Sequence, residues 1–215
     1  IPQVIYYVYA YLKGVKSNWL KLGESFNVCV PTGNFGDIFA GYLAREIGVP
    51  IEKFICASNK NNVLTDFFNT GVYNRNRTFY KSNSPAMDIL ISSNLERLLY
   101  FVAGSGTVVN CMRSLADTGA YSIDKDILDE INADFCGFYA DESATNETIA
   151  NIYDNYNYLC DPHTAVAINI ANKYFDYSED DKNTVVLSTA SPYKFSKSVL
   201  SCISDYENDD EFMVV

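Results

Sequence analysis

The stretch VPTGNFGD, residues 30–37, decides the fold because it separates an apolar run from a helical pattern. The apolar run at 26–31 predicts a buried strand, and the amphipathic pattern at 37–47 predicts a helix. A second short apolar run at 53–57 predicts another strand. Strand, helix and strand within about 30 residues form a βαβ unit, which needs parallel strands and a right-handed crossover.

The rest of the chain continues this alternation. Further strands are expected at 135–139 and 184–188, and an irregular segment at 71–85. Helices are expected at 1–13, 63–68, 88–103, 108–117, 124–132, 141–158, 161–175 and 195–206. The 215 residues therefore predict an α/β fold, a three-layer αβα arrangement around a mainly parallel sheet.

Charge and cysteine content narrow the function classes. The chain has 16 Lys and Arg against 27 Asp and Glu, a net charge of -11, which argues against a nucleic-acid partner. Its apolar runs are too short for a membrane span. No C-x-x-C pair or zinc spacing occurs, so no metal site is expected, and free thiols in a reducing cytoplasm are the simplest interpretation. The six cysteines are Cys29, Cys56, Cys111, Cys136, Cys160 and Cys202.

The glycine loop lies where ligands bind in parallel sheets, at the carboxyl end of a strand that opens a helix. Free backbone N–H groups and the helix dipole favour an anion there. Gly33 and Gly36 can adopt conformations closed to other residues, and they leave room for the backbone to approach a phosphate. We expect Asn34 to add an amide donor and Asp37 to cap the helix. A phosphate site and a plain tight turn both fit this pattern. The usual nucleotide loops, G-x-x-x-x-G-K-[ST] and G-x-G-x-x-G after a strand, are absent.

Five stretches carry a resemblance to a known family. They are VPTGNFGD at 30–37, CASNKNNVLT at 56–65, SPAMDILISSNLER at 84–97, DPHTA at 161–165 and STASPYKF at 188–195. Together they resemble the threonine synthases of the microbial and fungal branch. The resemblance implies a fold-type-II pyridoxal-phosphate enzyme, a carbon–oxygen lyase that converts O-phospho-L-homoserine and water to L-threonine and phosphate.

The resemblance also implies which residues hold the cofactor. The loop would bind the phosphate of pyridoxal 5'-phosphate, and Thr189 would hydrogen-bond the pyridine nitrogen. Ser188 is the alternative partner for that nitrogen, and a hydroxyl satisfied by its own backbone remains open for Thr189. The expected cofactor-binding residues are Gly33, Asn34, Phe35, Gly36 and Thr189.

Three further residues are candidates for the substrate side. Asn59 and Lys60 follow a strand end and are expected either to face the crevice or to form a solvated turn. His163 follows Asp161 and Pro162 in a first helical turn, where the helix dipole favours the neutral imidazole ring. Proton transfer, and positioning or packing, are both open for His163.

One family feature is missing from these residues. Threonine synthases carry their Schiff-base lysine near a Phe-Lys-Asp motif, and no such motif occurs here; Lys194 and Lys53 precede a phenylalanine instead. Residues 1–215 are therefore expected to be the C-terminal part of the cofactor domain, inactive alone and completed by an N-terminal segment of the same protein. The alternative is a non-catalytic module that binds a phosphate ligand or a protein partner.

Overall fold

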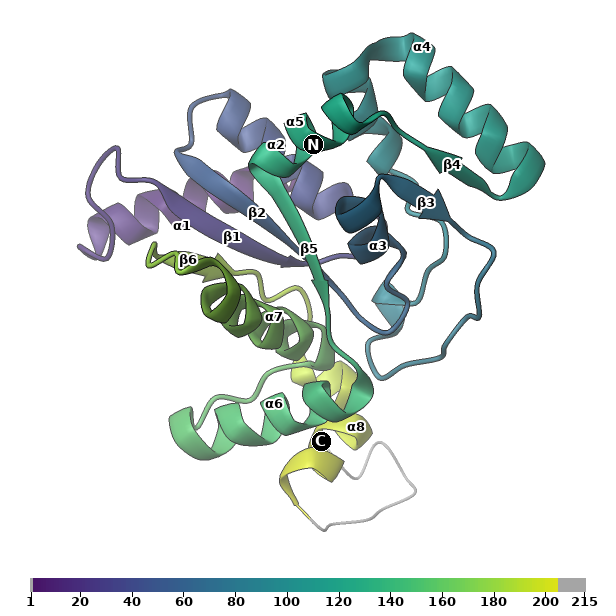
Figure 1. Ribbon diagram of the computed structural model, residues 1–215. Helices are drawn as coiled ribbons and strands as arrows, with labels where there is room; N and C mark the ends of the chain where they lie inside the picture. Colours follow the sequence, from purple (N-terminus) through teal and green to yellow (C-terminus); the bar gives the residue numbers. More distant parts are fainter. Residues whose placement is uncertain (1, 205–215) are drawn as a thin grey trace.

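The computed structural model describes residues 2–204 and places a four-stranded parallel sheet at the centre of the fold (Figure 1). Spatially the strands run β5-β2-β1-β6. Their bounds are β1 (Phe26–Pro31), β2 (Ile51–Ser58), β5 (Phe135–Tyr139) and β6 (Thr184–Val186). The α/β fold class is confirmed. Because β6 is the last of the described strands but pairs with β1, residues far apart in sequence meet at one sheet edge.

The predicted βαβ unit consists of β1, α2 (Gly36–Glu46) and β2. The two strands are parallel neighbours, with Val28 opposite Phe54 and Val30 opposite Cys56. The Thr32 N–H extends the ladder by donating to Ala57 O at 2.8 Å. The carboxyl end of β1 is therefore fixed to its neighbour up to the residue before the glycine loop.

Helices cover both faces of the sheet, as a parallel sheet requires. Alternating side chains divide between the faces: Val28 and Val30 belong to the larger core, and Cys29 belongs to the other. The larger core is covered by α2, α3 (Val63–Thr70) and α5 (Lys125–Asp134). The opposite face is covered by α7 (Pro162–Ser178), against which α6 (Glu142–Tyr156) packs (Figure 1).

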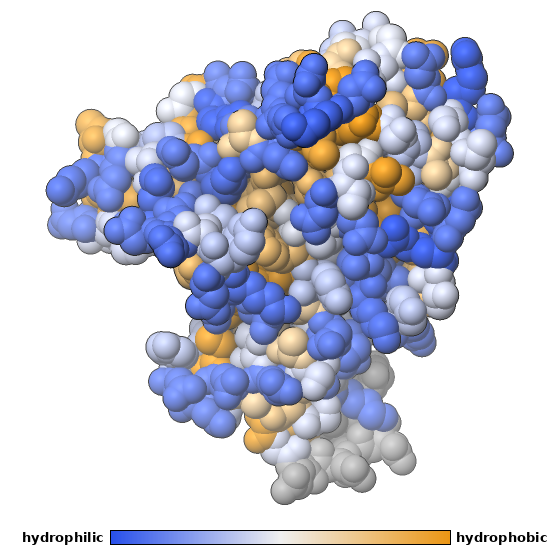
Figure 2. Space-filling model, viewed as in Figure 1, coloured by the Kyte–Doolittle hydropathy of each residue, from blue (hydrophilic) through white to orange (hydrophobic). Residues whose placement is uncertain are grey.

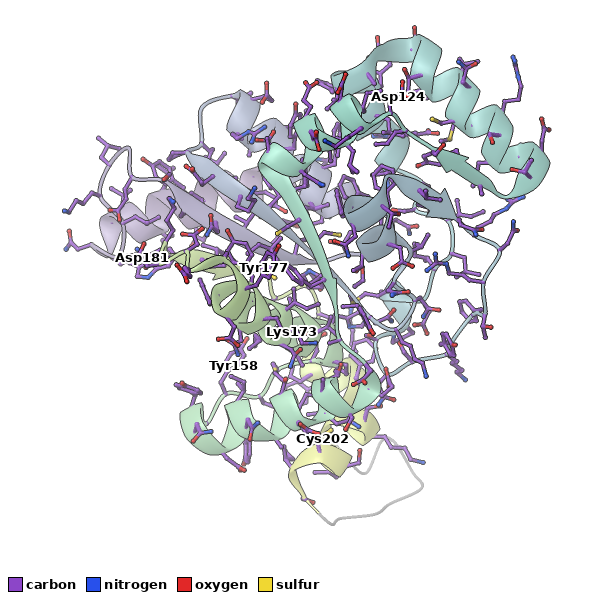
Figure 3. The ribbon with its side chains drawn as sticks, in the orientation of Figure 1. Asp124, Tyr158, Lys173, Tyr177, Asp181 and Cys202 are labelled. Atoms are coloured by element: carbon purple, nitrogen blue, oxygen red, sulfur yellow. The ribbon has the colours of Figure 1, made fainter. Side chains whose placement is uncertain are left out.

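Helix α7 also lies along the edge strand β5. Lys173 extends from α7 and donates to Tyr139 O at 2.9 Å, and the ring of Tyr177 lies 5.7 Å from that of Phe138 (Figure 3). Figure 2 shows a mostly hydrophilic surface on this side, with hydrophobic residues in a central hollow where β5 crosses the view in Figure 1. No helix within residues 2–204 is long and apolar enough to cross a membrane.

The remaining helices surround these layers. Helix α1 (Val4–Lys16) packs on α2, where a Cβ on Gly41 would lie 2.7 Å from the Tyr7 ring. Helix α8 (Ser196–Ile203) packs on α6 and follows the 3₁₀ turn η2 (Pro192–Phe195). The helix predicted at 195–206 is therefore found over residues 196–203, and positions 205–206 lie outside the described residues.

Two expectations about the segment between 71 and 122 were wrong. The segment at 71–85 contains β3 (Val72–Asn74), which pairs antiparallel with β4 (Ala120–Ser122). No helix begins at 88: the turn η1 (Pro85–Met87) is followed by irregular chain, and α4 (Leu95–Thr118) starts later. The reason is Asp88, whose carboxylate is committed to long-range hydrogen bonds with Asn59 and Asn61.

Candidate functional site

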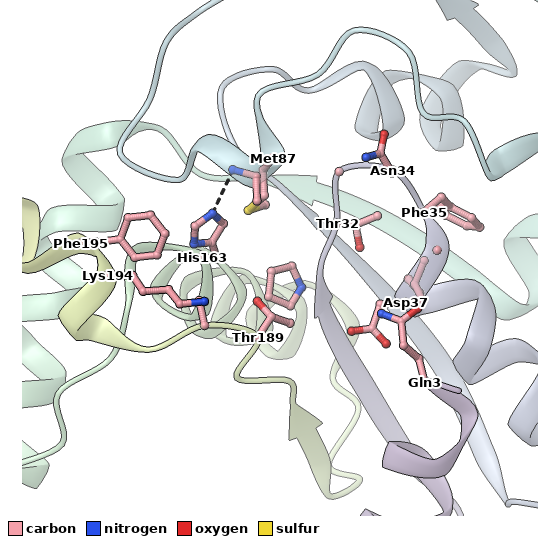
Figure 4. Close-up of a pocket in the computed structure, with 16 residues that line it drawn as sticks. Gln3, Thr32, Asn34, Phe35, Asp37, Met87, His163, Thr189, Lys194 and Phe195 are labelled. Atoms are coloured by element: carbon pink, nitrogen blue, oxygen red, sulfur yellow. Dashed lines mark hydrogen bonds between the residues drawn. The ribbon is translucent and has the colours of Figure 1, made fainter. Parts of the chain in front are cut away.

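A cavity of about 410 Å³ opens at the carboxyl ends of β1 and β6. Its walls come from the glycine loop, the Ala86–Met87 turn, His163 at the start of α7, and the segment after β6 (Figure 4). The loop and Thr189 therefore line the same cavity, as expected for the ends of parallel strands. No cluster of three or more metal-ligating side chains occurs within residues 2–204.

The Gly33 and Asn34 carbonyls of the loop accept hydrogen bonds, whereas the loop amides have no acceptor among the described residues. Ser92 Oγ donates to Gly33 O at 2.8 Å, and Asn94 donates to Asn34 O through its backbone N–H at 3.1 Å and its amide at 2.7 Å. In the described part of the chain, the N–H groups of residues 33–36 donate to no protein acceptor. Four unpaired donors at the positive end of α2 favour a bound anion.

Of the two roles expected for the glycines, a special backbone conformation is not found. Neither Gly33 nor Gly36 adopts a positive φ; the left-handed residue is Phe35, with φ 63° and ψ 6°. That conformation costs roughly 1–2 kcal/mol in a non-glycine residue. Packing of the buried Phe35 ring against Phe68 and Phe135, with centroids 6.1 and 5.8 Å away, holds it in place. Gly33 is needed for close approach, since a Cβ there would lie 2.6 Å from Ala86 O.

Asp37 does not cap α2, contrary to expectation. The N-cap residue is Phe35, and Asp37 lies in the first turn of the helix. The Tyr7 hydroxyl donates to the Asp37 backbone carbonyl at 2.9 Å and approaches its carboxylate at 3.3 Å. Partial burial raises the pKa of Asp37, and the hydrogen bond from Tyr7 opposes that shift. Asp37 thus joins α1 to the helix that carries the loop.

His163 is buried and fully hydrogen-bonded. Its Nδ1 lies 2.8 Å from Asp161 Oδ1, and its Nε2 accepts from the Ala86 N–H at 3.1 Å. Accepting at Nε2 requires a lone pair there, so the ring is neutral with its proton on Nδ1. Burial opposes ionisation of Asp161, but hydrogen bonds from His163 and Thr164 outweigh it and lower the pKa of Asp161. His163 therefore positions the Ala86–Met87 wall of the cavity.

The two hydroxyls after β6 differ in their partners. Ser188 Oγ is 3.4 Å from the Thr164 hydroxyl, which also bonds the Asp161 carboxylate. The Thr189 hydroxyl has no partner within residues 2–204, and Thr189 lines the cavity while Ser188 does not. Of the two candidates for a ligand nitrogen, Thr189 is the one that remains available.

Asn59 and Lys60 lie away from the cavity wall. The buried Asn59 amide donates to Ser82 Oγ and Asp88 Oδ1, both at 2.8 Å, and so fixes the segment that leads to Ala86. Lys60 is exposed, with its ammonium 4.3 Å from the centre of the Tyr80 ring. Of the two alternatives for this pair, the exposed Lys60 fits the solvated turn, whereas Asn59 is engaged by the 82–88 segment and neither side chain lines the cavity.

Sequence reasoning missed three contributors to the site. Ser92 and Asn94 tie back the loop carbonyls. Lys194 lines the cavity from the opposite wall, although the sequence assigned it no role in the site. The signal for Ser92 and Asn94 is a short polar run before a helix, which predicts a cap but not a partner 60 residues away.

Known proteins resemble this chain across nearly its whole length. The family described as threonine synthase, C-terminal, matches residues 164–213. Threonine synthase of Saccharomyces cerevisiae is 36% identical over 225 residues, covering 97% of this chain and 43% of that protein. Human threonine synthase-like 1 is 37% identical over 207 residues, covering 94% of this chain and 27% of that protein. The chain thus spans less than half the length of these relatives.

Solved structures agree with these matches. The crystal structure of yeast threonine synthase superposes with a TM-score of 0.88 at 34% identity, covering 98% of this chain and 44% of that one. The PLP-bound threonine synthase from Brucella melitensis gives 0.86 at 36% identity, covering 94% and 42%. The fold is accordingly that of the fold-type-II pyridoxal-phosphate enzymes. Within that class, the chain is similar to threonine synthases, of which it matches less than half the length.

Proposed function

We propose that the protein containing this chain is a threonine synthase, which converts O-phospho-L-homoserine and water to L-threonine and phosphate with pyridoxal 5'-phosphate. The observation that carries the proposal is the cavity itself. The four residues at the start of α2 whose amides have no acceptor within residues 2–204 line the same cavity as Thr189, whose hydroxyl also has no partner in that range. The identity of about 36% to a yeast protein of that name supports the choice of reaction.

The described residues fit the cofactor. The amides of residues 33–36 would hold its phosphate, with the dipole of α2 supplying positive potential in an otherwise acidic chain. Thr189 would donate to the pyridine nitrogen and leave it unprotonated, where a carboxylate would hold the pyridinium form. Bound pyridoxal phosphate supplies an electron sink for the carbanionic charge that forms at the substrate.

The residues expected on the substrate side act indirectly in this proposal. His163 keeps its proton on Nδ1 for Asp161 and uses Nε2 to hold Ala86, so it orients a wall and transfers no proton. Asn59 fixes the segment before that wall. The lysine that reacts with the cofactor would come from an N-terminal segment of the same protein, because these 215 residues contain no Phe-Lys-Asp motif.

The test is an assay of the complete protein that the gene encodes, with O-phospho-L-homoserine and pyridoxal phosphate. We expect equal release of phosphate and threonine. Thr189→Ala should weaken cofactor binding and shift its absorption, Thr189→Ser should restore both, and Ser188→Ala should resemble the wild type. Absence of threonine formation in a cofactor-loaded wild type would reject the proposed reaction.

One alternative is a module that binds a phosphate ligand or a protein partner without catalysis, and the absence of a Phe-Lys-Asp motif from these 215 residues favours it. In that case the wild type would retain pyridoxal phosphate but release no phosphate from the substrate.

The cysteines within the described residues are all free thiols, which supports a reducing compartment, the cytoplasm, as the location.

A further inference from the structure

The cavity has a second feature that attracts anions, on the wall opposite the loop. Lys194 belongs to η2, and Figure 4 shows its side chain extending toward Thr189. The position of its backbone is fixed on both sides. Its N–H donates to Ser191 O at 3.1 Å, and the ring of Phe195 packs 4.9 Å from that of His163. The ammonium is therefore carried on an anchored turn.

Lys194 is distinguished by the charges of the residues that line the cavity. Among its described lining residues, Lys194 is the one cation and Asp37 is the one carboxylate. Asp37 is engaged by Tyr7, and Lys194 forms no ion pair with any described residue. A chain with a net charge of -11 repels anions, so an ammonium without an ion-pair partner in the described residues favours a second anion at this point.

Two separate anion-binding features on opposite walls give the cavity places for two anions. The cofactor phosphate, as proposed above, accounts for the amides on the loop wall. The side chain of Lys194 is exposed, whereas most of the loop is buried, so its anion lies at the mouth of the cavity. A group that must leave into water after bond cleavage belongs at the mouth. A lysine ammonium suits it as a compact charge with three rotatable donors.

We infer that Lys194 binds the phosphate monoester of the amino-acid substrate and thereby selects phosphorylated over unphosphorylated substrates. This inference rests on the proposed function. Lys194 holds the ester phosphate in the bound substrate and neutralises charge on it as the carbon–oxygen bond breaks. The oxygen leaves with the bonding electron pair, as inorganic phosphate. The inference concerns affinity and specificity and assigns Lys194 no part in proton transfer.

The experiment uses the complete protein loaded with pyridoxal phosphate, as wild type, Lys194→Met, Lys194→Arg and the control Lys60→Met. Lys60 is also exposed but lies outside the cavity. The probes are 2-amino-5-phosphonopentanoate, which cannot release phosphate, and norvaline, which lacks only the phosphonate. Affinities are measured by calorimetry at low and high salt, and cofactor content is checked by absorbance.

We expect Lys194→Met to weaken phosphonate binding by at least about tenfold, the order that a charge-assisted hydrogen bond contributes. Norvaline binding should change less than about twofold, and the loss should shrink at high salt. Lys194→Arg should stay near the wild type, and Lys60→Met should match it. Unchanged phosphonate affinity in Lys194→Met, or an equal loss for norvaline, would overturn the inference. A wild type that makes no threonine would instead reject the proposed function, and the inference with it.

Discussion

At the scale of single residues, the site depends on backbones that approach one another closely. Ala86 is held from one side by His163 Nε2, and its carbonyl lies against Gly33 on the other side. Asp161 fixes the histidine in turn. A series of hydrogen bonds and contacts therefore connects the start of α7 to the glycine loop, and each residue in it can be substituted separately.

Gly33→Ala should destabilise the protein by about 1–3 kcal/mol, since the new Cβ would meet a backbone oxygen that cannot move alone. Urea unfolding of the complete protein measures the loss, and cofactor titration should show weaker binding. Gly106→Ala is the control, because a Cβ there meets nothing within 4 Å. Wild-type stability and affinity in Gly33→Ala would contradict the close approach.

Asp161→Asn should cost about 1–3 kcal/mol at neutral pH, because a buried acceptor of several hydrogen bonds is weakened. The pKa of Asp161 is lowered in the folded state, so its contribution is full above the unfolded pKa of about 3.9. The contribution is lost as pH falls through the lower, folded pKa. The difference between wild type and variant should therefore narrow below about pH 4.

Urea unfolding at several pH values checks this dependence. The exposed Asp181→Asn provides the matched control and should show no comparable gap at neutral pH. A gap between wild type and Asp161→Asn that stayed constant down to pH 3 would show that ionisation of Asp161 contributes nothing to stability.

At the scale of elements, α4 consists of two helical pieces joined at a glycine. Gly104 has φ 76° and ψ 175°, a conformation that is essentially restricted to glycine. The first piece buries Leu95, Leu98 and Leu99 in the core, and the second buries Cys111 and Leu115. The kink thus lets one stretch of chain cover both α2 and the small β3–β4 sheet.

Two glycines in α4 provide a matched comparison. Gly104→Ala should destabilise the fold by about 1–3 kcal/mol through backbone strain alone, because no atom lies within 4 Å of its added Cβ. Gly106→Ala should be neutral or stabilise by up to about 1 kcal/mol, since alanine favours helix. Thermal unfolding of both variants decides the matter. Equal melting temperatures would mean that α4 does not need the kink.

At the scale of the whole molecule, the site is assembled by chain topology. The strand that ends nearest Thr189 is the last of the described strands in sequence, and it pairs with β1 at the edge of the sheet. Its three residues are only half-buried because it is an edge strand, whereas a buried strand over 184–188 was expected. The cavity is therefore complete only when β6 has paired with β1, two strands that lie more than 150 residues apart in the sequence.

The 215-residue chain alone should form no threonine from O-phospho-L-homoserine, since it contains no lysine in the family's Phe-Lys-Asp context. Phosphate release is measured with purified chain and pyridoxal phosphate, beside the complete protein as a positive control. Borohydride reduction followed by peptide mapping locates any lysine that reacts with the cofactor. Threonine formation, or one lysine labelled stoichiometrically, would place the reacting lysine within these residues.

The sequence by itself determined the βαβ unit, because apolar runs, helical periodicity, and the glycine and proline residues that end helices and form turns are local signals. Strand β1 and strand β5 match their predicted bounds, and Asp161 caps α7 as expected. The loop at 30–37 was located at the start of α2 for the same reason. Family resemblance then indicated the residues around it.

Only the tertiary structure decided which groups in the site remain available. The 88–94 segment is irregular because Asp88 bonds a distant asparagine pair, and Phe35 takes the left-handed conformation because its ring packs in the core. His163 is engaged at both ring nitrogens, whereas the side chains of Thr189 and Lys194 line the cavity without a hydrogen-bond or ion-pair partner among residues 2–204. Such outcomes depend on partners tens of residues away, and local sequence patterns carry no information about which distant groups fold against them.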